Sequence, residues 1–385
     1  MSKDIVVIGS GTAGSRLARQ LGTEVTVLGE EPHAPYNRVL LAEVLAGRYG
    51  ADAITQPAVP VRRGVRVVRI DRADRVVQCD DGSAIPYGTL VLATGSNPVL
   101  PPLRGLGNEL PDGVHPFRTL DDCVALSEAV RPGTRAVVIG GGLLGVSAAR
   151  ALALRGAQVV LAQQGERLME RQLDVSASDL LRTHLTDLGV EVHTECHVRG
   201  LRGRDVELAD GYVLTSDLTV LACGARPRTG LARAAGLDVR KGIVVDDELR
   251  TSDPRIHAVG DCAEHNGQVY GLAGPAVEQA DVLAELLSGR PAAYTGTRAL
   301  TRLTLNGPGP LDLAAFGETT PLPGDDVVAL ADATRGAYRK VVVRGDRLVG
   351  GVLLGDLTSV GELARTWEGD EPLPSTPLVH LLGGS

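Results

Sequence analysis

The 385-residue sequence lacks the cysteine patterns that hold metals or redox disulfides. Its five cysteines are widely separated, without a C-x-x-C, a C-x4-C or any cluster with metal-ligand spacing. A zinc site, an iron–sulfur cluster and a disulfide between neighbouring cysteines therefore have no visible ligands, and we expect no metal. Most of these residues should be reduced, inert thiols in the core. They are Cys79, Cys123, Cys196, Cys223 and Cys262.

Long apolar runs, a leader sequence and blocks of like charge are also missing. The longest apolar candidate, Ala136–Ala149, is interrupted by four glycines and falls short of the roughly 20 residues needed to cross a bilayer. The first four residues lack the form of a signal peptide. A net charge of −8 is spread along the chain, which argues against a nucleic-acid partner. The sequence thus predicts a cytoplasmic protein that binds neither membrane nor nucleic acid.

The sequence does contain one pattern twice: an apolar run, a glycine-rich turn and a segment with helical spacing. The turns are Gly9-Ser-Gly-Thr-Ala-Gly14 and Gly140-Gly-Gly-Leu-Leu-Gly145. A lone G-x-G-x-x-G motif is weak evidence, but two copies, each followed by a further apolar run, are strong evidence. The apolar runs are Ile5–Ile8, Val25–Leu28, Ala136–Ile139 and Gln158–Ala162, and the helical segments are Ser15–Leu21 and Val146–Leu154.

The spacing of these glycines suits a dinucleotide. The first glycine makes the turn, the second lets a pyrophosphate approach the backbone, and the third lets the helix pack on the strand. Free N–H groups at the helix N-terminus then hold the phosphate charge. The alternative is that each motif is a tight strand–helix turn without a ligand.

Three more glycine turns follow strand-like runs. They are Leu90–Gly95, Thr219–Gly224 and Ile256–Cys262, the last with the sequence Val-Gly-Asp-Cys. Asp261 in the third turn could accept hydrogen bonds from a sugar-like hydroxyl, or it could cap the following helix. We expect that helix at Ala276–Leu287 or just before it.

Together these motifs resemble the two-dinucleotide flavoprotein reductases, which bind FAD in the first fold and NAD(P)H in the second. Three stretches are similar to the FAD module of assimilatory NAD(P)H-nitrite reductase large subunits, with rubredoxin and ferredoxin reductases as stand-alone relatives. These stretches are Ala34–Leu41, Arg167–Met169 and Arg347–Asp356. The resemblance implies an α/β fold with two Rossmann-like domains and a small C-terminal α+β domain.

The resemblance also implies a domain order. FAD would bind residues 1–112 and 236–293, NAD(P) would bind residues 113–235, and residues 294–385 would form an interface domain. The last segment supports this by itself, because Arg339–Val343 and Leu348–Leu354 flank the turn Arg344–Arg347 as in a hairpin.

Individual roles follow from the resemblance, position by position. For the FAD phosphates, the implied residues are Gly9, Gly11, Thr12, Ala13 and Gly14 of the loop, with Arg38 beside them. The adenosine half would bind an acid at the ribose, for which Glu30 is preferred over Glu31, and Val67 at the adenine. The flavin half would bind Thr94 and Gly95, with Gly260 and Asp261 at the ribityl chain and Leu272 at the isoalloxazine. For NADH or NADPH, the implied residues are Gly140, Gly142, Leu144, Gly145, Gln163 and Gly224.

Three positions depart from the family pattern. Many relatives hold a Lys–Glu ion pair near flavin N5, but Glu43 and Ser147 stand at those positions. With no cation from that pair, the extra carboxylate would make the flavin harder to reduce, unless Glu43 points into solvent. The third departure is Gln163, where relatives carry an acid for the NADH ribose. We therefore expect comparable use of NADH and NADPH. Arg167 and Arg171 could meet a 2′-phosphate, or could pair with Glu166 and Glu170.

The expected function is an FAD-dependent oxidoreductase that takes hydride from NAD(P)H and passes electrons to a separate acceptor. The acceptor would be an iron–sulfur protein, a rubredoxin or a small molecule, and the protein could be a homodimer. One alternative is a flavoprotein with a degenerate NAD(P) site, acting directly on an organic substrate or reduced by a partner protein. Another is a cofactor-free scaffold that only binds partners.

Overall fold

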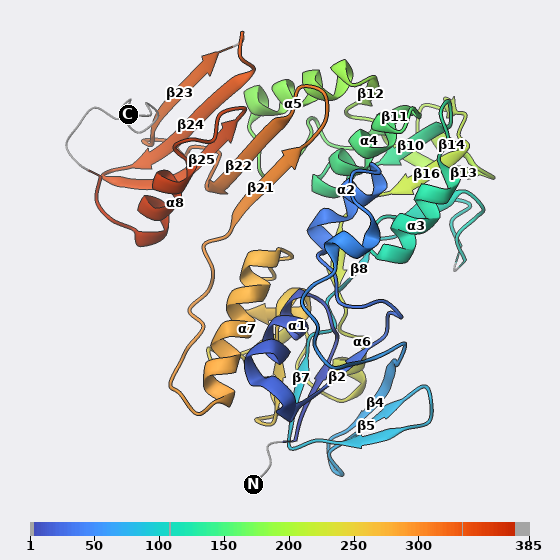
Figure 1. Cartoon of the computed structure of the whole chain (residues 1–385). Helices are drawn as coiled ribbons and strands as arrows, with labels where there is room; N and C mark the ends of the chain where they lie inside the picture. The colour runs from blue at the N-terminus through green and yellow to red at the C-terminus, as the bar shows by residue number, and fades with distance from the viewer. Residues whose placement is uncertain (1–3, 108, 333, 374–385) are drawn as a thin grey trace. The chain divides into compact units, whose positions relative to one another are not determined.

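The computed structural model describes residues 4–107, 109–332 and 334–373 (Figure 1). Contacts within the chain divide it into two units. The first consists of Met1–Leu41, Tyr49–Pro98 and Ala225–Thr297, and the second of Ala42–Arg48, Val99–Gly224 and Arg298–Ser385. The edges of the first unit differ from the expected 1–112 and 236–293, because β8 (Ser96–Pro98) pairs with β17 (Ala225–Pro227) inside it.

The first unit is built on a five-stranded sheet in the order β19-β7-β1-β2-β3. All of its neighbouring strands run parallel. The central strand β1 is fully buried, as expected of a parallel sheet covered on both faces. Helices α1 (Thr12–Leu21) and α7 (Ala273–Leu287) pack against each other beside it. The strands are β1 (Ile5–Ile8), β2 (Val25–Gly29), β3 (Val61–Arg63), β7 (Thr89–Leu92) and β19 (Ile256–Ala258).

Smaller elements complete the first unit. An antiparallel sheet holds β4 (Val67–Asp71), β5 (Val76–Cys79) and β6 (Ala84–Pro86), and β18 (Ile243–Val245) pairs with β20 (Ala263–His265). The remaining elements are α6 (Gly230–Ala234) and the 3-10 turns Gly22–Glu24, Arg38–Leu40, Ala51–Ile54 and Gly260–Cys262.

The second unit contains another five-stranded parallel sheet, in the order β12-β11-β10-β16-β9. Its central strand β10 (Arg135–Ile139) leads into α4 (Leu143–Leu154), as β1 leads into α1 in the first unit. The repeated strand–turn–helix–strand units predicted from the sequence are therefore both present. The other elements are α2 (Leu41–Leu45), α3 (Leu120–Ala129), α5 (Val175–Asp187), β9 (Val114–Pro116), β11 (Gln158–Ala162), β12 (Val190–His193), β13 (Val198–Arg202), β14 (Asp205–Leu208), β15 (Val213–Leu214) and β16 (Leu218–Leu221).

The C-terminal part of the second unit is an antiparallel sheet in the order β21-β22-β25-β24-β23. Helix α8 (Val360–Gly369) packs on it through Trp367, whose ring lies 5.2 Å from that of Phe316. From β24, Tyr338 and Lys340 both donate to Asp174, the N-cap residue of α5, at 2.8 and 2.7 Å. The predicted hairpin is confirmed as β24 and β25. The strands are β21 (Leu300–Leu305), β22 (Leu311–Gly317), β23 (Asp326–Asp332), β24 (Ala337–Arg344) and β25 (Arg347–Leu354).

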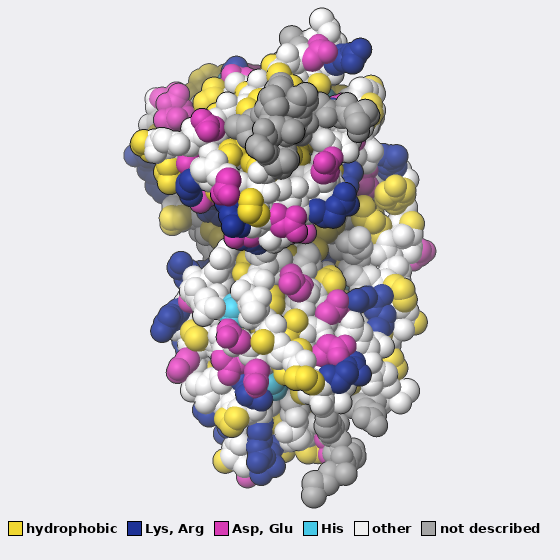
Figure 2. Space-filling model, turned by 90° about the vertical axis from the view of Figure 1, so that its left-hand side faces the viewer, with side chains coloured by type: hydrophobic (Ala, Val, Ile, Leu, Met, Phe, Trp, Pro, Cys, Tyr) yellow, Lys and Arg dark blue, Asp and Glu magenta, His cyan; other side chains and the backbone are white. Residues whose placement is uncertain are grey.

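The surface carries both signs of charge side by side. On the face shown in Figure 2, arginine and acidic side chains are interspersed. Exposed ion pairs of the described residues include Arg62 with Asp81 at 3.3 Å and Arg69 with Asp71 at 3.2 Å. Among the described residues, none of the helices has the length and apolarity that a membrane span requires.

Candidate functional site

The first glycine turn leaves open space at one of its three glycines. A Cβ on Gly9 would lie 2.1 Å from the carbonyl oxygen of Ala93, and a Cβ on Gly14 would lie 1.9 Å from that of Gly9. Both positions are closed by backbone, so only glycine fits there. At Gly11, by contrast, no atom lies within 4 Å of the Cβ position. The turn therefore has room where a pyrophosphate would approach, and Thr12 and Ala13 open α1 directly behind it.

Three distant segments of the first unit meet at this turn. The Ala93 carbonyl that closes Gly9 belongs to the turn holding Thr94 and Gly95. A Cβ on Gly260 would lie 3.2 Å from the Cβ of Ala13, which places the third turn against the start of α1. The structure thus brings together most of the residues predicted for FAD.

The third turn is fixed by residues that the sequence did not point to. The Gly260 N–H donates to Gln279 Oε1 at 2.7 Å, and Ser96 donates to Asp261 Oδ2 at 2.8 Å. Asp261 lies in a 3-10 turn that leads into β20, and α7 begins only at Ala273. The alternative that Asp261 caps the following helix is therefore wrong.

Both candidate ribose acids follow β2, but each already contacts an arginine. Glu30 is exposed and pairs with Arg228. Glu31 pairs with Arg38 and accepts a hydrogen bond from the Tyr36 hydroxyl at 2.6 Å. Burial acts to lower the pKa of Arg38, but Tyr36, Glu31 and Asp261 together raise that pKa above its usual value. Arg38 thus lies in the field of Asp261, where it can serve a diphosphate as a bidentate donor.

The remaining FAD candidates are Val67 and Leu272. The segment before Val67 is bonded to the end of β2, since the Val65 N–H donates to the Gly29 carbonyl at 3.0 Å. Val67 itself is buried at the start of β4. Leu272 is the N-cap residue of α7.

The second glycine turn repeats the geometry of the first within the second unit. A Cβ on Gly140 would lie 2.5 Å from the Ala222 carbonyl oxygen, and one on Gly145 would lie 1.7 Å from that of Gly140. At Gly142 no atom lies within 4 Å. Leu144 lies in the first turn of α4, and Gly224 adopts φ +100° with open space at its Cβ position.

Gln163 lies directly after β11 and is bonded to this turn. Its Oε1 accepts from the Gly141 N–H at 2.7 Å, and its Nε2 donates to the Arg167 carbonyl at 3.3 Å. The amide is therefore held at the edge of the phosphate loop, where the family pattern has an acid. It carries no charge that would oppose a 2′-phosphate.

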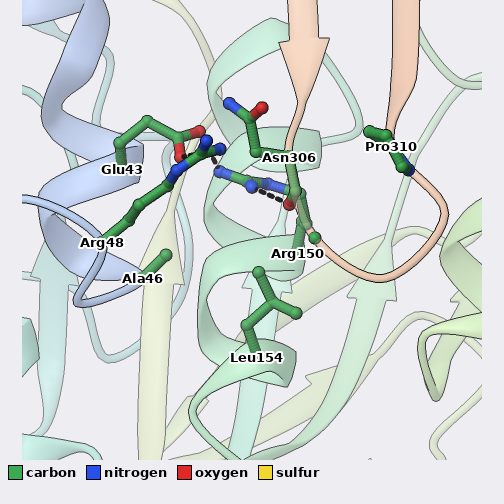
Figure 3. A pocket seen from close by; sticks show the side chains of 8 residues that line it. Glu43, Ala46, Arg48, Arg150, Leu154, Asn306 and Pro310 are labelled. Carbon is green, nitrogen blue, oxygen red and sulfur yellow. Dashed lines mark hydrogen bonds and ion pairs between the residues drawn. The ribbon is translucent and has the colours of Figure 1, made fainter.

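Glu43 is buried against a cation that the sequence did not reveal. Its Oε1 lies 2.5 Å from the Arg150 guanidinium, and the two side chains are only 7% and 1% exposed. Arg48 approaches the other carboxylate oxygen at 3.7 Å, and Arg150 also donates to the Asn306 carbonyl (Figure 3). Burial lowers the pKa of Arg150, although Glu43 acts in the opposite direction. The expectation of an unopposed or solvent-screened carboxylate is therefore wrong.

These charges line a pocket of about 330 Å³ within the second unit (Figure 3). Leu154 of α4 and the loop at Asn306, which follows β21, form its other walls. Ser147 is buried on the same helix as Arg150 and donates to the Leu143 carbonyl at 2.7 Å. Glu43 thus pairs with Arg150, which lies three residues beyond Ser147 on α4. No sequence motif signals Arg150, because arginine supplies almost all positive charge in this chain.

The five cysteines are free thiols. Cys79, Cys123 and Cys262 are buried, whereas Cys196 and Cys223 are only partly covered. Burial raises the pKa of both Cys123 and Cys223 to about 11. Since the thiolate is the reactive form, both thiols are unreactive near neutral pH.

Comparison with known proteins agrees with this geometry. The sequence profile of the pyridine nucleotide-disulphide oxidoreductases matches residues 3–280, which covers both glycine turns and the Asp261 turn. The chain belongs to the pyridine nucleotide-disulphide oxidoreductase family. The α/β fold class predicted from the sequence is confirmed. Residues 304–368 match the C-terminal domain of rubredoxin NAD+ reductase.

Relatives of this oxidoreductase include large and small proteins. It is 34% identical over 99% of its length to the nitrite reductase [NAD(P)H] of Bacillus subtilis, covering 49% of that protein. It is 31% identical over 90% of its length to a probable ferredoxin reductase of Castellaniella defragrans, covering 88% of that protein. The chain thus spans about half the length of the nitrite reductase but most of the ferredoxin reductase.

Solved structures share the whole fold. The putidaredoxin reductase in a covalent complex with putidaredoxin superposes with a TM-score of 0.85, at 26% identity over 98% of this chain and 97% of that chain. A ferredoxin reductase from Rhodopseudomonas palustris gives the same TM-score at 27% identity, covering 96% of each chain.

Proposed function

We propose that this oxidoreductase accepts hydride from NADH or NADPH on FAD and passes electrons singly to a separate iron–sulfur protein. One observation carries the proposal: each of the two folds has a phosphate turn whose middle glycine faces open space. A chain with two such turns can hold two dinucleotides. The flavin and the nicotinamide supply the redox chemistry, and the protein binds and orients them.

In the first unit, Gly11 and the free N–H groups at the start of α1 would hold the FAD pyrophosphate. Arg38 would add a charged donor for the phosphates, and Glu30 or Glu31 would accept from the adenosine ribose. Their present partners, Arg228 and Arg38, keep both acids in place. Asp261, positioned by Ser96, would accept from a hydroxyl of the ribityl chain.

In the second unit, Gly142 and the start of α4 would hold the pyrophosphate of the nicotinamide dinucleotide. Gln163 is already hydrogen-bonded to the loop, so it would mainly shape the ribose site. Cys123 and Cys223 would not react as thiolates near neutral pH, because burial raises the pKa of each to about 11.

An iron–sulfur acceptor is supported by two relatives, each of which this chain matches over most of the relative's own length. One is named a probable ferredoxin reductase, and the other was solved in complex with putidaredoxin. A further relative of Bacillus subtilis, 35% identical over 91% of this chain and covering 47% of that protein, is an assimilatory nitrate reductase electron transfer subunit. We place the protein in the cytoplasm and propose that it forms a homodimer through its C-terminal domain.

A second function is favoured by Ser147, which donates to the Leu143 carbonyl of its own helix, and by Gln163, which accepts from the Gly141 N–H of the glycine turn. Neither side chain has the charge found in relatives. If the nucleotide site is degenerate, the flavin would act directly on an organic substrate or be reduced by a partner.

Anaerobic stopped-flow spectroscopy separates the two. The purified protein should contain FAD, and NADH or NADPH should bleach the flavin absorbance near about 450 nm within the dead time or in a single fast phase. A plant-type or bacterial ferredoxin added next should restore the absorbance. An FAD-loaded protein that neither nucleotide bleaches would establish the second function instead.

A further inference from the structure

A carboxylate lies at the edge of the second sheet, where the strand β11 ends and Gly165 follows. The Glu170 Oε2 atom is 2.1 Å from the position that a Cβ on Gly165 would take, and Gln163 Nε2 is 2.8 Å from the same position. Glu170 is exposed, and within the described part of the chain its carboxylate has no hydrogen-bond or ion-pair partner. Glu170 therefore points back across the loop toward Gln163.

This location is next to the phosphate turn. Gln163 Oε1 accepts from the Gly141 N–H, and the Met169 N–H donates to the Gly141 carbonyl at 2.9 Å. The two bonds hold the segment that ends at Glu170 against the turn. In a dinucleotide-binding fold, the adenosine ribose lies between this turn and the end of the second strand. A hydroxyl acceptor is needed there, and Gln163 has already committed its oxygen to the backbone.

The two neighbouring arginines differ in their contacts. The Gly165 carbonyl accepts from the Glu195 backbone N–H at 2.9 Å, which fixes the loop. Arg167 is engaged, because its Nε donates to the Leu173 carbonyl at 3.3 Å and its Nη1 faces Glu166 at 3.9 Å. Arg171 is exposed and remains as the nearby cation.

We propose that Glu170 determines nucleotide choice by accepting a hydrogen bond from the adenosine ribose and repelling a 2′-phosphate. The protein then prefers NADH over NADPH. A 2′-phosphate carries a charge of about −1.5 to −2 at neutral pH, so a carboxylate beside it is unfavourable. This inference rests on the proposed nucleotide site, and it replaces the expectation of comparable use that Gln163 alone suggests.

The test measures binding of the two ligands ADP-ribose and 2′-phospho-ADP-ribose to the FAD-loaded protein by calorimetry. They differ only in the 2′-phosphate and do not react with the flavin. Wild type should bind ADP-ribose at least about tenfold more tightly, which is about 1.4 kcal/mol. Glu170→Gln should reduce the ratio to about threefold or less. Glu170→Arg should reverse it.

Glu166→Gln is the matched control, since it removes the same charge from an exposed residue that pairs with Arg167. Its affinity ratio should stay at the wild-type value, and the melting temperature of each variant confirms folding. Equal ratios for the two ligands in wild type, or equal shifts in the Glu170→Gln and Glu166→Gln variants, would overturn the inference and leave the proposed function standing. If wild type binds neither ligand, both the proposed nucleotide site and the role of Glu170 are wrong.

Discussion

The two dinucleotide folds of this chain share a backbone and differ in the side chains that follow the second strand. In both, the outer glycines are closed by carbonyl oxygens and the middle glycine is open. In the first unit, the second strand ends at two acids that arginines hold in place. In the second unit it ends at Gln163, an uncharged amide bonded to the loop. If both turns bind dinucleotides as proposed, the shared backbone accounts for the common pyrophosphate, and the different side chains account for the choice between the two dinucleotides.

The turns after the later strands differ in the same way. Thr94 donates to the Arg228 carbonyl at 2.8 Å in the first unit. At the matching place in the second unit, the Cys223 thiol contacts the Ile139 carbonyl at 3.5 Å. A hydroxyl makes a stronger bond than a thiol, so the first turn is tied more firmly to its neighbouring segment.

The largest effects should come from filling the open glycine positions one at a time. Gly11→Val should give protein without FAD, because the side chain occupies the space of the pyrophosphate. Gly142→Val should keep FAD and lose nucleotide binding by about a hundredfold or more, a change of about 2.7 kcal/mol. Flavin absorbance and calorimetry with ADP-ribose measure the two outcomes.

Gly230→Val and Gly361→Val are the controls, since each glycine lies in a helix of one unit with no atom within 4 Å of its Cβ position. Both should retain both ligands. Full FAD occupancy in Gly11→Val would show that the two turns are not equivalent.

Breaking the buried pair should destabilise the second unit alone. Arg150→Met leaves the Glu43 carboxylate buried with only Arg48 nearby, and should lower the free energy of unfolding by about 3–5 kcal/mol. Urea unfolding followed by Trp367 fluorescence reports on the second unit, because this is the only tryptophan of the chain. Release of FAD reports on the first.

Adding Glu43→Gln to Arg150→Met should recover part of the loss, since it removes the unpaired charge. Parallel loss of FAD at the same urea concentration as the Trp367 change would contradict the assignment of the pair to one unit. A double variant as unstable as the sum of the singles would show that the two side chains do not interact.

Alkaline pH should destabilise the second unit through its buried thiols. The pKa of Cys123 and Cys223 is about 11 in the folded protein, and a thiol in the unfolded chain has a pKa near 8.5. The folded state keeps the proton longer, so stability is complete below about pH 8.5 and declines as the pH rises toward 11. We expect a loss of about 1 kcal/mol per thiol between pH 9 and 10, measured by urea unfolding. The Cys123→Ala, Cys223→Ala double variant should lack this decline, and an identical decline in it would assign the effect to other groups.

The smallest effect should come from making the turn at Cys223 resemble the turn at Thr94. Cys223→Thr introduces the hydroxyl found at Thr94 and should change the melting temperature by only a few degrees, corresponding to less than about 1 kcal/mol.

Replacing all five cysteines should leave the rate of flavin reduction by NADH within about twofold of the wild-type rate. A folded, FAD-loaded, cysteine-free protein that NADH does not reduce would show that a thiol takes part in electron transfer.

The sequence by itself predicted the repeated fold and the glycine turns on which the proposed FAD site depends. Glycine spacing does so because Gly9, Gly14, Gly140 and Gly145 face backbone oxygens that admit no side chain. Apolar runs such as Ile5–Ile8 predicted the buried strands, since a parallel sheet is covered on both faces. Gly14 and Gly145 face carbonyls only five residues earlier, which a local pattern reveals, whereas the carbonyls that close Gly9 and Gly140 come from Ala93 and Ala222, far along the chain.

Only the tertiary structure decided the partners of the charged side chains. Glu43 meets Arg150 across 107 residues, and Gly260 meets Gln279 through a side-chain oxygen from α7. Glu170 lies over Gly165 because the segment between them turns back onto the phosphate loop. A charge acts through distance in space and through burial, and neither can be counted along a chain in which arginine occurs at so many positions.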